Sequence, residues 1–129
     1  MITVYGIKNC NTMKKCFEYL EQHGIDYAFV DYKKAQVGDE TLQAWTEDFG
    51  LDKLINKQGT TYKKLTDEDK AIINQAIENK QVLAIADMIR AHQSMIKRPI
   101  VTGAHQETQV ALIGFDVAAF DKVFSASSL

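Results

Sequence analysis

Cys10 is the side chain in this 129-residue sequence that is best placed to act as a nucleophile. It lies between a strand predicted over residues 2–5 and a helix predicted to begin just after it. The first turn of a helix carries partial positive charge and unpaired N–H groups, and both stabilise a thiolate over a thiol. Lys8 and Lys14 flank the cysteine and add positive charge. Because the thiolate is the reactive form of cysteine, we predict a lowered pKa for Cys10 and a nucleophilic role.

The second cysteine, Cys16, falls six residues later on the predicted helix. Six residues correspond to roughly 9 Å of helical rise, whereas the Cα atoms of a disulfide lie within about 7 Å of each other. A direct bridge from Cys10 to Cys16 would therefore require the first turns of the helix to unwind. We predict instead that Cys16 packs in the core beside Met13 and Phe17.

The spacing around Cys10 also excludes two other thiol mechanisms. A Cys-x-x-Cys motif would need cysteine where the sequence has Met13, and a phosphatase loop would need arginine where it has Cys16. A single reactive thiol needs an external thiol to complete a redox cycle, and glutathione is the abundant cytoplasmic candidate. The competing interpretation is that Cys10 is a small buried residue without reactivity.

The elements around Cys10 form a βαβ unit. Strand-forming residues occupy positions 2–5 and 25–31, and apolar residues at helical spacing lie between them. Asn11 or Thr12 is predicted to cap the intervening helix, and Gly24 to end it. Two strands joined in this way predict a parallel pair with a right-handed crossover.

The remainder of the chain is predicted to contain first helices, then two strands and then a final helix. Helices are predicted over residues 38–49, from residue 66 and over residues 82–90, so we interpret residues 35–92 as a helical insertion. Strands follow over residues 99–102 and 109–113, joined by a turn over 103–108. A final helix is capped by Asp116, and residues 125–129 are expected to fray.

The order β-α-β, helical insertion, β-β-α predicts an α/β protein with a thioredoxin-like sheet. We expect one domain over residues 1–129, because this length suits one domain better than two.

Composition excludes several classes of function. The formal net charge is −2, and the 15 basic residues are dispersed, which argues against a dedicated nucleic-acid surface. The three histidines are scattered without metal-ligand spacing, so no metal is expected. We find no signal peptide and no apolar run long enough for a membrane span, and therefore expect a cytoplasmic protein that does not bind membranes.

Four short segments of the sequence resemble the arsenate reductase/Spx family. They are Tyr5-Gly6-Ile7-Lys8-Asn9-Cys10-Asn11-Thr12, Gly59-Thr60-Thr61, Lys97-Arg98-Pro99 and Ile113-Gly114-Phe115. The sequence looks closest to the proteobacterial arsenate-reductase-related branch, for which glutathione-dependent thiol reductase activity has been proposed. The resemblance extends from Met1 to about Phe124.

The resemblance implies roles for residues in two separate segments of the sequence. Cys10 would be the nucleophile, and the peptide bond before Pro99 would be cis, which would turn the backbone of Arg98 toward the thiol. Arg98 would offer a forked donor for a carboxylate or oxyanion; a solvent-facing arginine is the competing interpretation. The other residues assigned to substrate or glutathione contact are Lys8, Asn9, Asn11 and Thr12.

Three functions are compatible with this resemblance. The first is a thiol-disulfide reductase that uses glutathione, or glutaredoxin, as its thiol partner. The second is an Spx-like redox-responsive regulator that binds RNA polymerase, although such regulators usually carry Cys-x-x-Cys. The third is a glutathione- or glutaredoxin-dependent arsenate reductase, although that type looks to use three arginines and this chain holds only Arg90 and Arg98.

Overall fold

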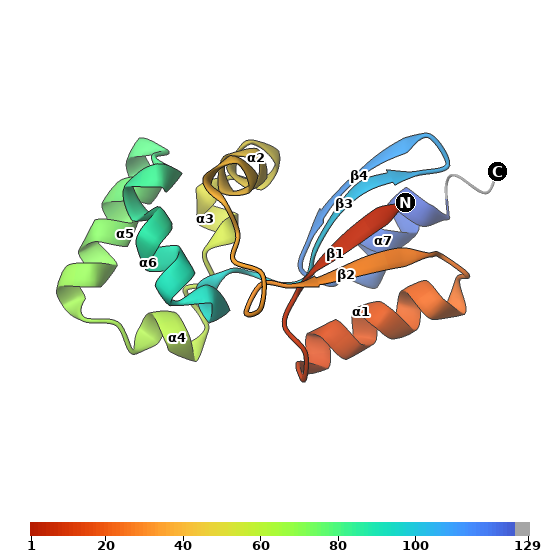
Figure 1. Ribbon diagram of the computed structural model, residues 1–129, viewed down its shortest axis with the longest axis horizontal. Coiled ribbons are helices and arrows are strands. Elements are labelled where there is room, and N and C mark those ends of the chain that lie inside the picture. Colours follow the sequence, from red (N-terminus) through yellow and green to blue (C-terminus); the bar gives the residue numbers. More distant parts are fainter. Residues whose placement is uncertain (126–129) are drawn as a thin grey trace. The chain divides into compact units, whose positions relative to one another are not determined.

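The computed structural model describes residues 1–125, and the chain divides into two compact units. One unit contains Met1–Ala35 together with the chain from Arg98 onward, and the other contains Gln36–Lys97. Figure 1 shows a sheet with flanking helices in the first unit and helices in the second. The predicted α/β fold with a helical insertion is confirmed.

The first unit is built on a four-stranded mixed sheet of order β2-β1-β3-β4. Strand β1 pairs in parallel with β2 and antiparallel with β3, which in turn pairs antiparallel with β4. The parallel pair is connected through helix α1, as the βαβ pattern predicted. The bounds are β1 Ile2–Gly6, α1 Asn11–Gln22, β2 Tyr27–Asp31, β3 Ile100–His105 and β4 Thr108–Ile113.

Helix α1 and the last helix, α7 (Val117–Phe124), share one hydrophobic core with the sheet. Tyr19 of α1 lies edge-on to Phe120 of α7, with ring centroids 5.3 Å apart. Its hydroxyl donates a hydrogen bond to Asp121 Oδ1 at 2.6 Å. Cys16 is fully buried in this core, as predicted. The helix that follows Cys10 is therefore anchored to the sheet along its apolar face.

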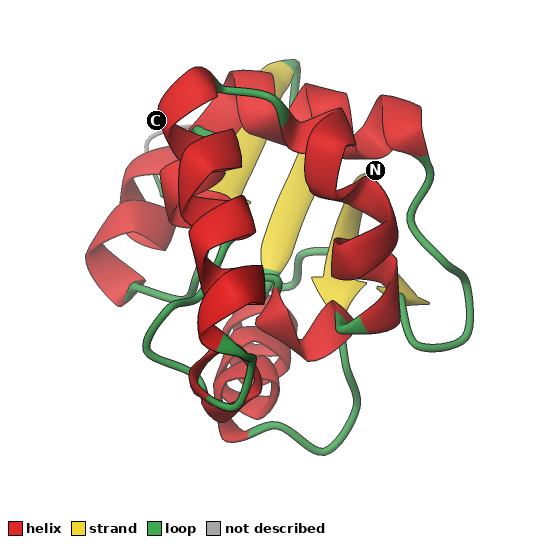
Figure 2. Cartoon of the chain, turned by 90° about the vertical axis from the view of Figure 1, so that its left-hand side faces the viewer, coloured by secondary structure: helices red, strands yellow, loops and turns green. Residues whose placement is uncertain are grey.

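The second unit is helical, and Figure 2 distinguishes its helices from the strands by colour. Helix α5 begins where the sequence predicts, because the Thr66 side chain accepts a hydrogen bond from the Asp69 N–H at 3.1 Å. Gly50, with φ at +87°, ends α2. The elements are α2 Asp39–Phe49, α3 Leu51–Leu54, α4 Thr60–Lys63, α5 Asp67–Asn79, η1 Val82–Ile85, α6 Ala86–Ala91 and η2 Gln93–Met95.

Two helices of the structure differ in detail from the helices that the sequence predicts. The helix expected over residues 82–90 is a 3-10 turn, η1, followed by α6, and the apolar side chain of Leu83 is 46% exposed. Helix α7 begins after Asp116 as predicted, but Val117 in its first turn is 52% exposed. Val117 shares the helical stripe of Phe120 and Phe124 by its spacing, so periodicity alone does not show that the first residue of α7 is left half exposed.

The predicted turn over residues 103–108 is wrong. Strand β3 continues to His105, and Gln106 and Glu107 alone make the turn, with φ of 49° and 68°. Two-residue hairpin loops usually carry Asn or Gly at such positions, so the sequence contains no signal for this one. The expectation of a frayed end over 125–129 falls mostly on residues 126–129, which lie outside the described range.

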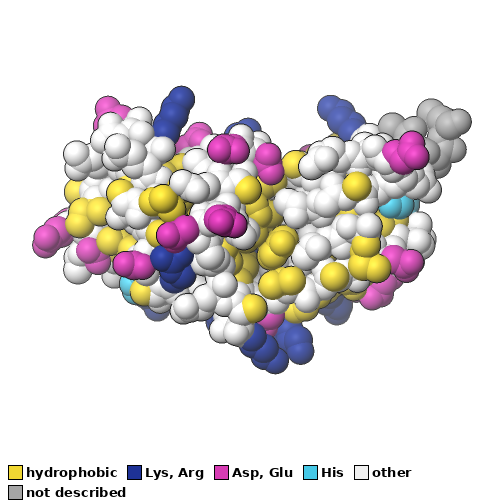
Figure 3. All heavy atoms as spheres, turned by 45° about the horizontal axis from the view of Figure 1, so that its top comes forward, with side chains coloured by type: hydrophobic (Ala, Val, Ile, Leu, Met, Phe, Trp, Pro, Cys, Tyr) yellow, Lys and Arg dark blue, Asp and Glu magenta, His cyan; other side chains and the backbone are white. Residues whose placement is uncertain are grey.

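The surface agrees with the dispersed charge of the sequence. On the face drawn in Figure 3, basic side chains lie in several separate places with acidic side chains among them. None of the helices within residues 1–125 is long and apolar enough to span a membrane.

Replacement of Gly103 by alanine is expected to destabilise the pairing of β1 with β3. Its φ is +114°, and an added Cβ would lie 2.8 Å from the Met1 carbonyl oxygen and 3.1 Å from Ile2 Cα. We expect the free energy of unfolding in urea to fall by about 2 kcal/mol. Gly38→Ala is the control, because a Cβ there meets nothing within 4 Å. Similar losses for the two variants would contradict this view of the β1–β3 contact.

Candidate active site

Three chain segments meet at one edge of the sheet. Gly6 at the end of β1 pairs with Asp31 at the end of β2, and Tyr5 pairs with Ile100 at the start of β3. The residues after β1, after β2 and before β3 are therefore neighbours. They bring together Cys10, Tyr32 and Arg98.

Cys10 occupies the N-cap position of α1 and is partly exposed. Its carbonyl oxygen accepts the first helical hydrogen bond, from the Lys14 N–H at 3.0 Å. Asn9 precedes it with φ at +61°, a left-handed conformation that asparagine tolerates better than most residues. The expected side-chain cap from Asn11 or Thr12 is wrong, because the residue at that position is the cysteine itself.

The pKa of Cys10 is lowered, as the sequence predicts. Burial raises this pKa, but the backbone amide of Met13, a hydrogen bond from the Arg98 side chain, the amide of Thr12 and the charge of Arg98 together outweigh it. The prediction assigned the cationic contribution to Lys8 and Lys14, whereas Arg98 supplies it. The sulfur therefore carries negative charge more readily than an ordinary cysteine and stays accessible.

Arg98 lies two residues before the first residue of β3 and is partly buried beside the thiol. Burial lowers its pKa, but contacts with Cys10 and Tyr32 raise it overall, so the guanidinium stays charged. The Arg98–Pro99 peptide bond is cis, which confirms what the family resemblance implied. Pro99 itself is buried, and its carbonyl oxygen accepts a hydrogen bond from the Gly114 N–H at 2.8 Å.

A hollow of about 500 Å³ opens beside Cys10 along helix α1. Three predicted contact residues line it, namely Lys8, Asn9 and Asn11. Thr12 acts through its backbone amide instead, and Arg98 and Pro99 are not among the lining residues. The lining continues along α1 with Lys14, Phe17, Glu18 and Glu21.

Sequence reasoning missed Tyr32 and the acidic end of the hollow. Tyr32 immediately follows a strand parallel to the one that leads to Cys10, so its place in the order of elements is the signal that could have identified it. Glu18 and Glu21 follow Lys14 by four and seven residues, a spacing that puts all three on one helix face. From the sequence alone, this pattern is typical of an ordinary solvent-exposed helix face, and only the structure shows that these residues line a hollow.

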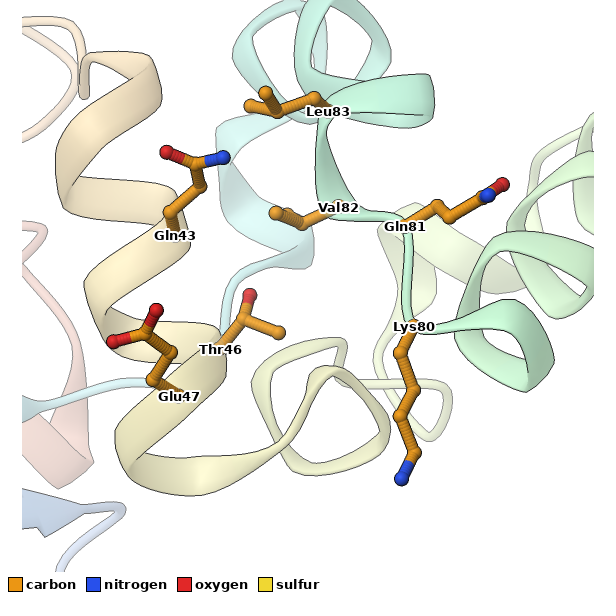
Figure 4. A pocket seen from close by; sticks show the side chains of 7 residues that line it. All are labelled: Gln43, Thr46, Glu47, Lys80, Gln81, Val82 and Leu83. Carbon is orange, nitrogen blue, oxygen red and sulfur yellow. The ribbon is translucent and has the colours of Figure 1, made fainter.

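Other parts of the described chain offer weaker chemistry. A second hollow, of about 410 Å³, lies in the helical unit, where Gln43, Thr46 and Glu47 of α2 face residues 80–83 (Figure 4). Its lining contains no thiol or histidine. Within residues 1–125, no group of His, Cys, Asp and Glu is arranged to hold a metal ion.

The two cysteines are expected to differ sharply in reactivity. Burial raises the pKa of Cys16 to about 12, whereas the pKa of Cys10 is lowered. With iodoacetamide under native conditions, Cys16→Ala should be alkylated once and rapidly, and Cys10→Ser should resist until it is unfolded. Peptide mass spectrometry of the labelled chains checks this. Equal labelling of both cysteines at neutral pH would contradict the assignment of Cys10 as the reactive thiol.

The comparisons with known proteins agree with the fold. A sequence model of the ArsC family matches residues 5–123. An uncharacterized protein of Haemophilus influenzae is 32% identical over 125 residues, which cover 97% of this chain and 100% of that protein.

Two solved structures share the fold and more than 30% of the sequence. A YffB protein superimposes with a TM-score of 0.79 and 33% identity, covering 96% of this chain and 99% of that one. A protein related to arsenate reductase from Brucella melitensis gives a TM-score of 0.64 and 36% identity, covering 95% and 93% of the two chains. The chain belongs to the ArsC family.

Proposed function

We propose that this protein is a glutathione-dependent thiol-disulfide reductase with Cys10 as its single nucleophile. The observation that carries the proposal is the accessible sulfur of Cys10, whose ionised form is favoured by the amides of Met13 and Thr12 and by Arg98. The other cysteine, Cys16, is buried and has a raised pKa, so it is unsuited to resolving a disulfide at Cys10. The resolving thiol must then come from outside the chain.

The proposed reaction has two exchange steps that balance in sulfur, protons and electrons. In the first, the Cys10 thiolate attacks the glutathione sulfur of a substrate mixed disulfide; the Cys10–glutathione bond forms, and the substrate sulfur leaves with the electron pair and takes up a proton. In the second, a glutathione thiolate attacks the glutathione sulfur bound to Cys10. Oxidised glutathione is released and the Cys10 thiolate is restored. Two electrons pass from glutathione to the substrate.

The groups that favour the Cys10 thiolate assist both steps. In the first step they increase the fraction of nucleophile at neutral pH. In the second step Cys10 is the leaving group, and a thiol with a lower pKa leaves faster. Arg98 therefore assists both steps, because it stabilises negative charge on the Cys10 sulfur when that sulfur attacks and when it leaves.

The hollow along α1 supports a small peptide-like thiol as partner. Lys8 and Lys14 lie at the end near Cys10, and Glu18 and Glu21 line its continuation. Glutathione carries two carboxylates and one ammonium group around its thiol, so it presents complementary charge of both signs. Phe17 contributes an apolar surface to the lining.

Arsenate is less well supported as the substrate. Arg90 pairs with Asp39 at 2.8 Å and with Asp87 at 3.0 Å within the helical unit. Arg98 is then the remaining arginine in the sequence, and it is the one beside the thiol. Lysines could add charge at the hollow but would not supply the forked donors that suit an oxyanion. An Spx-like regulator is also less well supported, because Met13 stands where such regulators usually carry the second cysteine.

We further propose that the protein acts in the cytoplasm, where glutathione is abundant and reduced.

Turnover should depend on one cysteine. With a glutathionylated peptide, glutathione, glutathione reductase and NADPH, Cys10→Ser should lose essentially all activity, because the nucleophile is gone. Cys16→Ala should retain most of its activity. Incubation of Cys16→Ala with oxidised glutathione should add one glutathione per chain by intact mass. Absence of both the adduct and the turnover would refute the proposed reductase, and a stable RNA polymerase complex from extract would then favour the regulator.

Charge reversal inside the hollow should weaken the use of glutathione specifically. Lys14→Glu is expected to raise the KM for glutathione several-fold, because it replaces a cation near the thiol by an anion. Lys15→Glu is the matched control, since Lys15 is exposed on the same helix but does not line the hollow. Steady-state kinetics would compare the two variants. Equal KM changes would show that the hollow does not hold glutathione.

A further inference from the structure

Tyr32 is a fully buried residue in contact with the charged group that acts on the thiol. It directly follows β2, and its N–H donates a hydrogen bond to the Gly6 carbonyl oxygen at 3.1 Å. The turn that follows is held by Asp31, whose carbonyl oxygen accepts from the Lys34 N–H at 3.0 Å and whose Oδ1 accepts from the Lys33 N–H at 2.9 Å. The Tyr32 backbone is therefore fixed to the end of β1.

The side chain of Tyr32 is hydrogen-bonded to the guanidinium of Arg98. The arginine side chain is long and has many rotamers, so a guanidinium near a thiol must be held if it is to act on the sulfur consistently. A tyrosine ring has only two side-chain torsions, and here it is completely enclosed. Its hydroxyl is thus a rigid acceptor for a flexible cation.

The chemical type of this acceptor matters. Burial is the main cause of the raised pKa of Tyr32, about 12, and Arg98 offsets part of it, so the phenol is neutral at physiological pH. A carboxylate in the same place would also hold Arg98, but its negative charge would cancel much of the effect of Arg98 on the thiol. A neutral phenol fixes the guanidinium and leaves its charge available to Cys10.

We infer that Tyr32 is a positioning residue of the proposed reductase: the Tyr32 hydroxyl holds the Arg98 guanidinium against the sulfur of Cys10. The inference rests on the proposed function for its biological meaning, but the positioning itself is independent of the substrate. Tyr32 follows the end of β2, so the inference adds a third segment to a site otherwise built from the loop before α1 and the segment before β3.

Several other charged groups surround these three residues and have to be held constant in a test. Lys8 and Lys14 line the hollow on the side of Cys10, and Glu18 and Glu21 line it further along α1. Asp31 acts on Tyr32 from the end of β2. The substitution Tyr32→Phe changes none of them and removes only the hydroxyl.

The test measures the alkylation rate of Cys10 against pH, with Cys16→Ala as the parent protein. Below neutral pH we expect Tyr32→Phe to react about threefold more slowly, which corresponds to a rise of about half a pKa unit in the thiol. At alkaline pH, where the thiol is ionised in every variant, the rates should converge. Tyr19→Phe is the matched control, because Tyr19 is also a buried residue and loses a partly buried hydroxyl that is hydrogen-bonded to an acidic side chain, Asp121.

Superimposable pH profiles for Tyr32→Phe and Tyr19→Phe would overturn the inference. A loss of rate that is equal at every pH would also overturn it, since that indicates altered access rather than altered charge. The variants are repeated in an Arg98→Met background, where Tyr32→Phe should have no further effect on the profile. A persisting effect would show that Tyr32 does not act through Arg98.

These outcomes are separate from those that test the reductase activity. A shifted profile in Tyr32→Phe with no glutathione-dependent turnover in the parent protein would refute the proposed function and keep the positioning role. Unchanged pH profiles in Tyr32→Phe, with normal glutathione-dependent turnover in the parent protein, would refute the positioning role and keep the proposed function.

Discussion

The site depends on the interaction between the sulfur of Cys10 and the positive groups that surround it. Burial works against ionisation of this thiol, so the amides of the first turn of α1 and the guanidinium of Arg98 have to outweigh it. The amides of Met13 and Thr12 belong to the cysteine's own helix, whereas Arg98 lies far away in the sequence, two residues before β3. The pairing of β1 with β3 brings the two contributions to the same sulfur.

The same arrangement explains why one cysteine is reactive and the other is not. Cys10 is the N-cap residue of α1 and Cys16 lies six residues later in the same helix, yet Cys10 is partly exposed beside Arg98, whereas Cys16 is fully buried in the core shared with α7. Burial without a compensating charge raises the pKa of Cys16 to about 12. A protein with this division of roles has one thiol to offer, which is why the proposed chemistry relies on glutathione to complete the cycle.

Much of this was predictable from the sequence, for identifiable reasons. Hydrophobic periodicity located the βαβ unit and the helical insertion, and the position of Cys10 at a strand-to-helix junction indicated its chemistry. Lys8 and Lys14 were chosen as the activating cations because sequence proximity was the only guide. Arg98 came from the family resemblance, and its contact with the sulfur is a tertiary effect of β1–β3 pairing. Tyr32 and the two-residue turn at Gln106 and Glu107 depend on strand register and backbone conformation, which no local pattern encodes.

The most direct measurement is an NMR titration of the Cys10 Cβ chemical shift in protein with 13C-labelled cysteine, since it follows each sulfur separately. The account predicts that Cys10 titrates below the ordinary value of a free cysteine, that Arg98→Met moves its midpoint upward, and that Cys16 does not titrate in the accessible range. A Cys10 midpoint at or above the ordinary value would contradict the account, as would a midpoint that does not respond to the loss of Arg98.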